Sequence, residues 1–316
     1  TLSRSSAASD VYKRQLEKIA NDIAALIPHA QRIAVPSGEA SKSLQQVERI
    51  VEDMLLKGAT RQYVLINVGG GMLTDLGGFI ASVFMRGMRC IHVPTSLLGM
   101  VDAAIGGKTG VDLGSVKNMI GTFEHPEAIV IDIDVLATLP DEQLREGLVE
   151  VVKMAATLDK EFFGWLEENV ERVLNRDAAA MLVCIQNAAR MKADVVAKDE
   201  RDNQQRLLLN FGHTVGHAVE ALSRFTISHG KAVSIGMAIE MAIANIAEKE
   251  RVIRLLETLD MPLNIPSDMQ PNTLWDIMRN DKKVLNGEVR IAVPTTIGTG
   301  EIRTITAADF SSTLSH

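Results

Sequence analysis

The chain has 316 residues, and its 33 basic and 40 acidic side chains give a formal net charge of −7. A hydrophobic content of 46% is that of a globular protein and excludes a disordered chain or a collagen-like fibre. The acidic balance argues against non-specific nucleic-acid binding, which needs clustered positive charge. No apolar run reaches the ~20 residues of a membrane span. Two cysteines are too few for a disulfide framework. These features favour a cytoplasmic protein with no membrane or nucleic-acid partner.

Residues 1–15 differ from the rest of the chain. They are polar and serine-rich, and they lack the apolar stretch of a secretory signal. We therefore predict that 1–15 is a non-native leader, and we exclude it from the fold.

Strand and helix patterns alternate after the leader as far as residue 140. Helical periodicity covers 16–27, 41–57 and 73–85, and β-favouring runs cover 32–36, 63–68, 90–94 and 128–133. Strands that alternate with helices at these lengths predict a parallel α/β sheet. We predict a Rossmann-like nucleotide-binding domain over 16–140. Its few strands suggest that it is incomplete at its N-terminus.

The pattern becomes mainly helical from residue 141. Helices are predicted over 141–157, 160–173, 177–197, 210–222 and 229–250. A hairpin is predicted over 289–305, with its turn near Gly298. The fold class is therefore an α/β domain followed by a mainly α-helical domain over 141–316.

Three consecutive glycines, Gly69 to Gly71, follow the apolar run 63–68 and precede a helix that carries Asp75. Glycines let a phosphate approach the backbone, and a helix N-terminus favours negative charge. The spacing is not G-x-G-x-x-G, because Thr74 stands at the last position. The segment therefore predicts either a nucleotide-phosphate site or a tight strand-to-helix turn.

A second glycine-rich loop, Gly106 to Thr109, contains Lys108. It is not a P-loop, because Asp102 stands where that motif needs a glycine. Lys108 can still bind an anion. The pair Lys117 and Asn118, in a similar loop, could converge on the same ligand.

Three of the seven histidines fall within residues 213–229. His213 and His217 share one helix face at i and i+4, and His229 follows. Catalytic zinc uses three protein ligands and an open position, and Glu150 is a candidate carboxylate ligand. Lys153 follows Glu150 by one turn in a largely apolar stretch, so both side chains are expected to be partly buried. The alternatives are structural histidines and an exposed ion pair.

Basic residues are scattered near these segments. Each alone is typical of a solvated surface, and together they would indicate a binding site only for a multiply anionic substrate. These residues are Arg86, Lys192, Arg206, Lys282 and Lys283.

Several segments together resemble the 3-dehydroquinate synthase family. The most specific are GHTVGH (212–217) and GGKTGVD (106–112). Others are PSGEASKSL (36–44), GGGMLTDLGGF (69–79), KNMIGTF (117–123), GLVEVVKMA (147–155), HGKAVSIGM (229–237) and DKKVLNG (281–287). They stand in the family's order, and the resemblance covers the chain from Leu16 on.

The resemblance implies an enzyme that binds NAD and a divalent metal, Zn²⁺ or Co²⁺. Its expected reaction converts 3-deoxy-D-arabino-heptulosonate 7-phosphate to 3-dehydroquinate and phosphate, in the shikimate pathway to aromatic amino acids. The implied steps are oxidation by NAD, elimination of phosphate, re-reduction, ring opening and aldol closure.

The resemblance also implies roles for individual residues. The metal ligands are Glu150, His213 and His229, so His217 becomes a substrate-facing residue that helps proton transfer. The catalytic set is Lys108, Lys153, Asn210 and His217. The substrate-binding set is Arg86, Asp102, Lys117, Asn118, Lys192, Arg206 and Lys282. The NAD-binding set is Glu39, Lys42, Gly70, Gly71, Asp75, Thr95 and Ser96. Arg86 resembles a residue that reaches a neighbouring subunit, which implies a homodimer.

The sequence also departs from the family pattern. Family members begin with further strands before the first segment that matches, and Lys231 stands where an acidic or neutral residue is commoner. Three alternatives remain: a sister cyclase that makes an epi-valiolone from sedoheptulose 7-phosphate, a metal-dependent NAD polyol dehydrogenase, and an inactive fragment. Sedoheptulose 7-phosphate has no carboxylate. Lys192 and Arg206, which resemble residues at the carboxylate end, therefore favour the heptulosonate.

Overall fold

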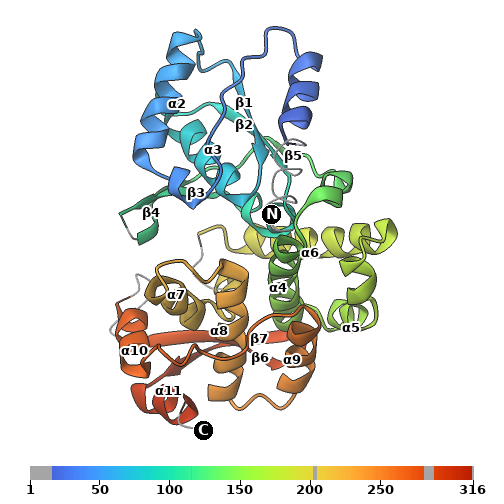
Figure 1. The fold of residues 1–316 in the computed structure, drawn as a ribbon, viewed down its shortest axis with the longest axis vertical. Helices are drawn as coiled ribbons and strands as arrows, with labels where there is room; N and C mark the ends of the chain where they lie inside the picture. The colour runs from blue at the N-terminus through green and yellow to red at the C-terminus, as the bar shows by residue number, and fades with distance from the viewer. Residues whose placement is uncertain (1–15, 115, 202–204, 281–287, 315–316) are drawn as a thin grey trace, which may run out of the picture. The chain divides into compact units, whose positions relative to one another are not determined.

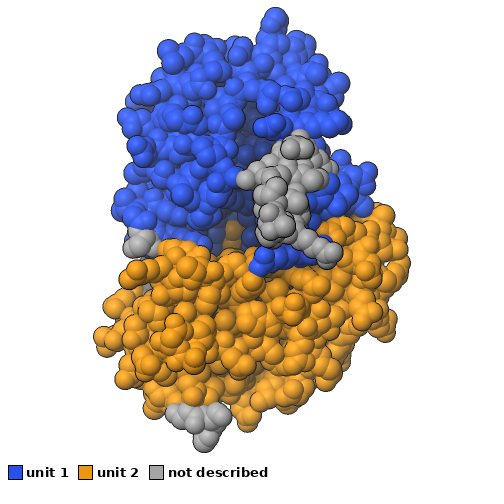
Figure 2. Space-filling model, viewed as in Figure 1, with its two compact units in different colours: residues 1–144 blue, residues 145–316 orange. Residues whose placement is uncertain are grey.

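A computed structural model describes residues 16–114, 116–201, 205–280 and 288–314. The chain divides into two compact units, residues 1–144 and 145–316 (Figure 2). The predicted leader at 1–15 and the predicted substrate residue Lys282 lie outside the described residues.

The first unit is built on a three-stranded parallel sheet in the order β1–β2–β5 (Figure 1). Strands β1 (Val64–Gly69) and β2 (Arg89–Pro94) pair along their whole length, and β5 (Ala128–Ile129) pairs with β2. The predicted parallel α/β sheet is confirmed. The last strand is shorter than the predicted 128–133. It ends at Ile129, residues 130–132 are irregular, and a short 3₁₀ helix, η4 (Ile133–Thr138), follows.

Helices α2 (Leu44–Leu56) and α3 (Gly71–Val83) pack with this sheet into the core of the first unit, and an earlier helix covers 16–26. Ser43 caps α2 by accepting a hydrogen bond from the amide of Gln46. The core is formed by apolar residues of both helices and the strands, including Val47, Ile50, Leu76, Phe79, Ile80, Cys90 and Val111.

Helix α3 lies very close to strand β1. A Cβ at Gly77 would fall 1.9 Å from Oδ1 of Asn67, a buried residue of β1. Asn67 in turn lies 3.1 Å from Nδ1 of His92 on β2. Glycine at 77 is therefore what allows the helix to approach the sheet.

Two predictions in the first unit are wrong. Residues 32–36 form no strand, because they pair with no neighbouring strand that the structure describes. Residues 106–109 and 117–118 do not form two loops, because most of them lie in an antiparallel hairpin of β3 (Lys108–Leu113) and β4 (Val116–Phe123). Gly110 pairs with Gly121 in that hairpin, so its pattern lacks apolar side chains at this position.

Helices and one hairpin form the second unit. The helices are α4 (Asp141–Leu158), which begins before the unit boundary, α5 (Lys160–Leu174), α6 (Ala178–Lys198), α7 (His213–Leu222), α8 (His229–Ile243), α9 (Lys249–Thr258), α10 (Pro271–Arg279) and α11 (Ala307–Leu314). The predicted hairpin is β6 (Val289–Thr296) and β7 (Thr299–Ile305), and Gly298 stands in its turn with φ at +88°. The mainly helical character of this part is confirmed.

The predicted helix over 229–250 is too long. Helix α8 ends at Ile243, and Asn245 adopts a φ of +50°, which a continuous right-handed helix does not allow. Helix α9 then begins at Lys249. Among the helices that the structure describes, none combines the length and apolar character needed to cross a membrane.

Candidate functional site

One acidic and two histidine side chains meet in the second unit. Glu150 lies on α4, and His213 and His229 are the first residues of α7 and α8. Oε1 of Glu150 lies 3.4 Å from Nε2 of His229 and 3.8 Å from Nε2 of His213. The ligand atoms of the three residues lie within 4.8 Å of one another. The structure thus brings together the three residues that the resemblance assigns to a metal.

The second ring nitrogen of each histidine faces an acceptor. Nδ1 of His213 lies 3.2 Å from the carbonyl oxygen of Phe211, and Nδ1 of His229 lies 3.1 Å from Oε2 of Glu220. A proton on Nδ1 satisfies these acceptors and leaves the lone pair on Nε2. Histidines that bind metals are oriented in this way in proteins.

The cluster fits a divalent metal. Zinc holds nitrogen and oxygen ligands at about 2.0–2.1 Å in a tetrahedron, which places those ligand atoms about 3.3 Å apart. The separations of 3.4 and 3.8 Å around Oε1 are close to this value. Oε1 of Glu150 is also buried without a hydrogen bond from any residue that the structure describes. A buried carboxylate oxygen needs such a partner, and a cation would supply it.

Lys153 sets the charge state of Glu150. The two side chains are almost fully buried, and Nζ of Lys153 forms an ion pair with Oε2. Burial alone raises the pKa of Glu150, but the charge of Lys153 and the contact with His229 lower it to about 2. Glu150 is therefore an ionised carboxylate, as a metal ligand must be.

His217 lies beside the cluster without joining the group around Glu150. Its ring centroid is 5.2 Å from that of His213 and 6.1 Å from that of His229. It can form a second group of candidate ligand atoms with Glu220 and His229. The i, i+4 spacing alone would make His213 and His217 equal partners, whereas the fold places Glu150 next to only one of them.

Two of the predicted substrate residues are buried cations of the second unit. Lys192 on α6 is 7% exposed, and Arg206 on the short helix η5 (Gln205–Asn210) is 3% exposed. The guanidinium of Arg206 donates to the carbonyl of Glu200 at 2.7 Å. Helix η5 contacts α6 and ends at Asn210, three residues before His213. These are not solvated surface charges, and buried cations need anionic or polar partners.

The glycine turn lies at the carboxyl end of β1 in the first unit. The amide of Thr95, after β2, donates to the carbonyl of Gly69 at 2.9 Å. A Cβ at Gly70 would lie 3.3 Å from Oγ of Ser96, and one at Gly71 would lie 2.9 Å from Cβ of Ala103. Close packing thus accounts for these glycines, and the same packing presents the N-terminus of α3 at the turn, where an anion binds favourably.

A polar cluster lies on the hairpin side of this unit. Lys42 is 4% exposed, and its Nζ donates to Oδ2 of Asp75 at 2.6 Å and also contacts Oδ1 of Asn118. Burial lowers the pKa of Lys42, but the charges of Asp75 and Glu39 outweigh it and raise the pKa. The structure thus joins two predicted NAD residues with Asn118, a predicted substrate residue.

The other predicted residues of the first unit are more dispersed. Glu39 and Lys108 are exposed, Lys117 is half-buried on β4, and Asp102 is half-buried in the short helix η3 (Gly99–Ala103). Arg86 is exposed in the short helix η2 (Phe84–Arg86), where Met85 and Arg86 both have positive φ, at +46° and +68°.

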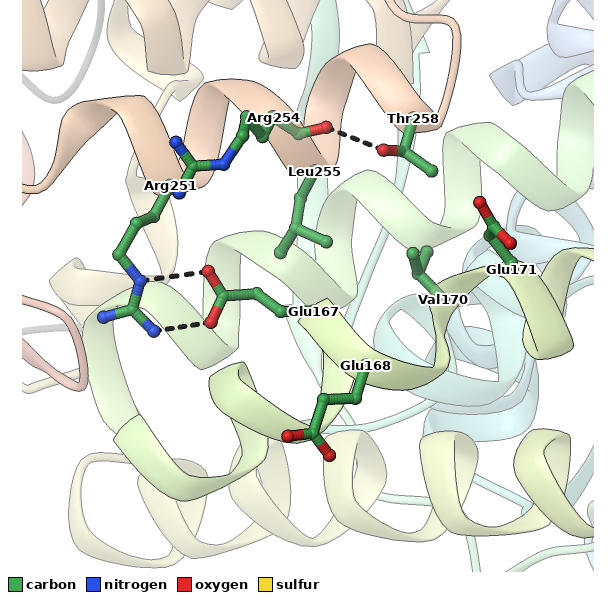
Figure 3. Close-up of a pocket in the computed structure, with 8 residues that line it drawn as sticks. All are labelled: Glu167, Glu168, Val170, Glu171, Arg251, Arg254, Leu255 and Thr258. Atoms are coloured by element: carbon green, nitrogen blue, oxygen red, sulfur yellow. Dashed lines mark hydrogen bonds and ion pairs between the residues drawn. The ribbon is translucent and has the colours of Figure 1, made fainter.

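A surface pocket of about 420 Å³ lies between α5 and α9 of the second unit (Figure 3). Arg251 faces Glu167 there, with nitrogen–oxygen distances of 2.9 and 2.6 Å. The same guanidinium donates to Glu248 at 2.8 Å. No predicted site residue within the described ranges lines this pocket, and its Arg251 is paired with Glu167.

Sequence reasoning missed two buried carboxylates, Glu220 on α7 and Glu240 on α8. The available signal was an acidic residue inside an otherwise apolar helical segment. Such a residue is costly to bury and therefore has a partner.

The chain matches two parts of one protein family. Residues 32–146 match the family described as 3-dehydroquinate synthase N-terminal, and residues 147–284 match the one described as 3-dehydroquinate synthase C-terminal.

Several solved structures are similar to this chain. A 2-epi-5-epi-valiolone synthase from Streptomyces hygroscopicus subsp. jinggangensis, with NAD⁺ and Zn²⁺ bound, is 29% identical, with a TM-score of 0.82 over 89% of this chain and 80% of that chain. A 2-deoxy-scyllo-inosose synthase complexed with carbaglucose-6-phosphate, NAD⁺ and Co²⁺ is 25% identical, with a TM-score of 0.77 over 88% of this chain and 80% of that chain. A glycerol dehydrogenase from Schizosaccharomyces pombe is 15% identical, with a TM-score of 0.59 over 87% of this chain and 74% of that chain, and shares the fold alone.

Proposed function

Because the chain belongs to the 3-dehydroquinate synthase family, we propose that it converts 3-deoxy-D-arabino-heptulosonate 7-phosphate to 3-dehydroquinate and phosphate. The reaction would make it a carbon–oxygen lyase that depends on NAD and a divalent metal. The observation that carries the proposal is the cluster of Glu150, His213 and His229, in which a buried carboxylate oxygen accepts no hydrogen bond from the described residues. The bound NAD⁺ with Zn²⁺ or Co²⁺ in two similar cyclases supports these cofactors.

Oε1 of Glu150 and the Nε2 atoms of His213 and His229 would hold the metal. A divalent ion there supplies Lewis acidity to the substrate hydroxyl that is oxidised. Lys153 keeps Glu150 ionised through its ion pair with Oε2. Lys153, His217 and Asn210 would hold and move protons on the substrate hydroxyls. The ring of His217 supports this role because it lies beside the rings of His213 and His229.

The glycine turn would bind NAD. Backbone amides at Gly70 and Gly71 and the N-terminus of α3 favour the pyrophosphate. Glu39, Lys42, Asp75, Thr95 and Ser96 would complete this site. NAD supplies a hydride acceptor that returns the hydride later in the cycle, so it is used catalytically.

Cations would recognise the two anionic ends of the substrate. Lys192 and Arg206 are buried in the unit that holds the metal cluster, and they are assigned to the carboxylate. Lys108, Lys117, Asn118, Asp102, Arg86 and Lys282 would bind the remaining groups, including the phosphate. Elimination needs little protein base, because the departing phosphate can itself take the proton made acidic by the oxidation.

The second candidate is a sister cyclase of the epi-valiolone type, which acts on sedoheptulose 7-phosphate. The 29% identity and TM-score of 0.82 to such a synthase favour it. That substrate has no carboxylate, so Lys192 and Arg206 would need another partner.

We also infer a cytoplasmic homodimer. Both cysteines, Cys90 and Cys184, are buried and free, which fits a reducing compartment. The exposed Arg86 is assigned to the site of a neighbouring subunit. Light scattering coupled to size exclusion would test the dimer, and a monomer that retains full activity would contradict this role of Arg86.

The test is phosphate release with Zn²⁺ and catalytic NAD, measured with each of the two sugar phosphates. Release from the heptulosonate alone, without net NADH, is the expected result. Release from sedoheptulose 7-phosphate alone would establish the second candidate. Steady NADH accumulation with a polyol would instead indicate a dehydrogenase, and loss of NAD binding in a folded protein would indicate an inactive fragment.

A further inference from the structure

Helices α7 and α8 touch through their backbones. A Cβ at Gly216 on α7 would lie 2.9 Å from the carbonyl oxygen of Ala232 on α8. A Cβ at Gly236 on α8 would lie 1.9 Å from the carbonyl oxygen of Gly212, just before α7. The pairs 212–236 and 216–232 run in opposite directions along the chain. The two helices are therefore antiparallel, and the start of each lies near the later turns of the other.

Glu240 of α8 caps the start of α7. It is fully buried, and its Oε2 accepts a hydrogen bond from the amide of Gly212 at 2.7 Å. Its Oε1 accepts from the amide of Val215 at 3.1 Å. Helix α7 has no side-chain cap of its own, because Gly212 stands at the N-cap with φ at +78°. A carboxylate there satisfies first-turn amides and complements the helix dipole. In the chain, His213 lies between Gly212 and Val215, whose amides donate to Glu240.

Glu220 of α7 holds the ring at the start of α8. It is 2% exposed, and its Oε2 lies 3.1 Å from Nδ1 of His229. A carboxylate on Nδ1 fixes which ring nitrogen carries the proton and how the ring is turned. Nε2 then points at Oε1 of Glu150, 3.4 Å away.

The arrangement is reciprocal. Each helix begins with one histidine of the cluster. A buried glutamate near the end of the partner helix contacts either the ring of that histidine, as Glu220 does, or the backbone on both sides of it, as Glu240 does. We propose that Glu220 and Glu240 are positioning residues that set His229 and His213 in place before the metal binds. The proposal rests on the metal site of the proposed function and names the residues that preorganise it.

Zinc affinity tests the proposal. The zinc dissociation constant of metal-free protein would be measured by competition with a chelator for the wild type, Glu220→Ala, Glu220→Gln and Glu240→Gln. Glu168→Gln is the matched control, because it removes one negative charge from an exposed position on α5 of the same unit. Far-UV circular dichroism and thermal unfolding of each metal-free variant would report folding.

We expect Glu220→Ala to weaken zinc binding 10- to 100-fold, the usual effect of losing such a partner. Glu220→Gln keeps an acceptor oxygen and should weaken it less, and Glu240→Gln should weaken it about tenfold. Glu168→Gln should bind zinc as the wild type does. If the Glu220 variants bind zinc as tightly as the wild type, Glu220 is structural and its assignment is overturned. If Glu240→Gln lowers the thermal stability but leaves the zinc affinity unchanged, the same conclusion holds for Glu240.

One measurement needs no variant to fold. In zinc-loaded wild-type protein, nitrogen NMR of the histidines should show His229 protonated on Nδ1, with slow exchange. Protonation on Nε2 would overturn the role of Glu220. A wild-type protein that binds no zinc would refute the proposed metal site itself, which separates that failure from equal affinities among the variants.

Discussion

The two candidate sites differ in whether backbone or side-chain atoms form them. In the first unit, the glycine turn is a backbone feature, and the adjacent Lys42, Asp75 and Asn118 already satisfy one another. In the second unit, the cluster around Glu150 is made of buried and half-buried side chains, and it includes an oxygen that accepts no hydrogen bond within the described part of the chain. In the first site, close packing and these contacts already account for the glycines and the polar side chains. A cation at the second site would bind this oxygen, which is why we propose a metal there.

This difference predicts that the two sites fail separately. A side chain removed from the metal cluster leaves buried charge without its counterpart, which is costly. A change at the glycine turn alters how closely a ligand can approach the backbone. Four substitutions or measurements would break or sharpen this contrast.

His213→Ala should have the largest effect. It removes one of three ligands, so zinc content by elemental analysis and phosphate release should both be lost. NAD affinity in the metal-free protein should stay within about twofold of wild type. His29→Ala, at an exposed position of the first unit, is the control. A His213→Ala protein with full zinc content would refute the ligand assignment.

Lys192→Ala should weaken heptulosonate binding tenfold or more. A charge-assisted hydrogen bond is worth about 1.5–3 kcal/mol, which corresponds to this change. NAD affinity, measured by calorimetry, should change little. Lys198→Ala, at an exposed position of the same helix, serves as the control. Equal losses of substrate and NAD affinity would mean that Lys192 has a structural role.

Gly71→Ala should lower NAD affinity about tenfold and leave zinc content unchanged. The new Cβ would meet Cβ of Ala103 at 2.9 Å, so the turn must shift. Gly164→Ala on α5 is the matched control, because nothing lies within 4 Å of the added atom. An unchanged NAD affinity would show that the turn is packing and does not bind the cofactor.

His92 should have the smallest effect on the two sites, because it lies outside both and should change only the pH dependence of stability in the first unit. Burial lowers the pKa of His92 to about 4, whereas an unfolded histidine titrates near ~6.5. The unfolded chain therefore binds more protons between these values. The stabilising contribution is complete above about pH 6.5 and is lost as the pH falls toward 4. Denaturant unfolding over this range should show stability that falls more steeply toward low pH in the wild type than in His92→Gln, and equal slopes would exclude His92.

Local sequence determined much of the fold. The run 63–68 and the glycines after it predicted a parallel strand and a tight turn, because an apolar β-favouring run followed by glycine has few other structures. Apolar spacing likewise located α2, α5 and α6 to within a few residues. Periodicity failed at Asn245, where a single positive φ ends α8, and at β3–β4, whose paired glycines remove the apolar pattern.

The sequence by itself also determined which residue types were present for a metal site: three histidines, and a glutamate in an apolar helix. Only the tertiary structure decided their arrangement. Neighbours along a helix share a face, so spacing groups His213 with His217. The packing of α4 against α7 and α8 instead brings Glu150 to His213 and His229. It also gives Glu220 and Glu240 their partners, because hydrogen bonds between separate helices depend on where the helices cross.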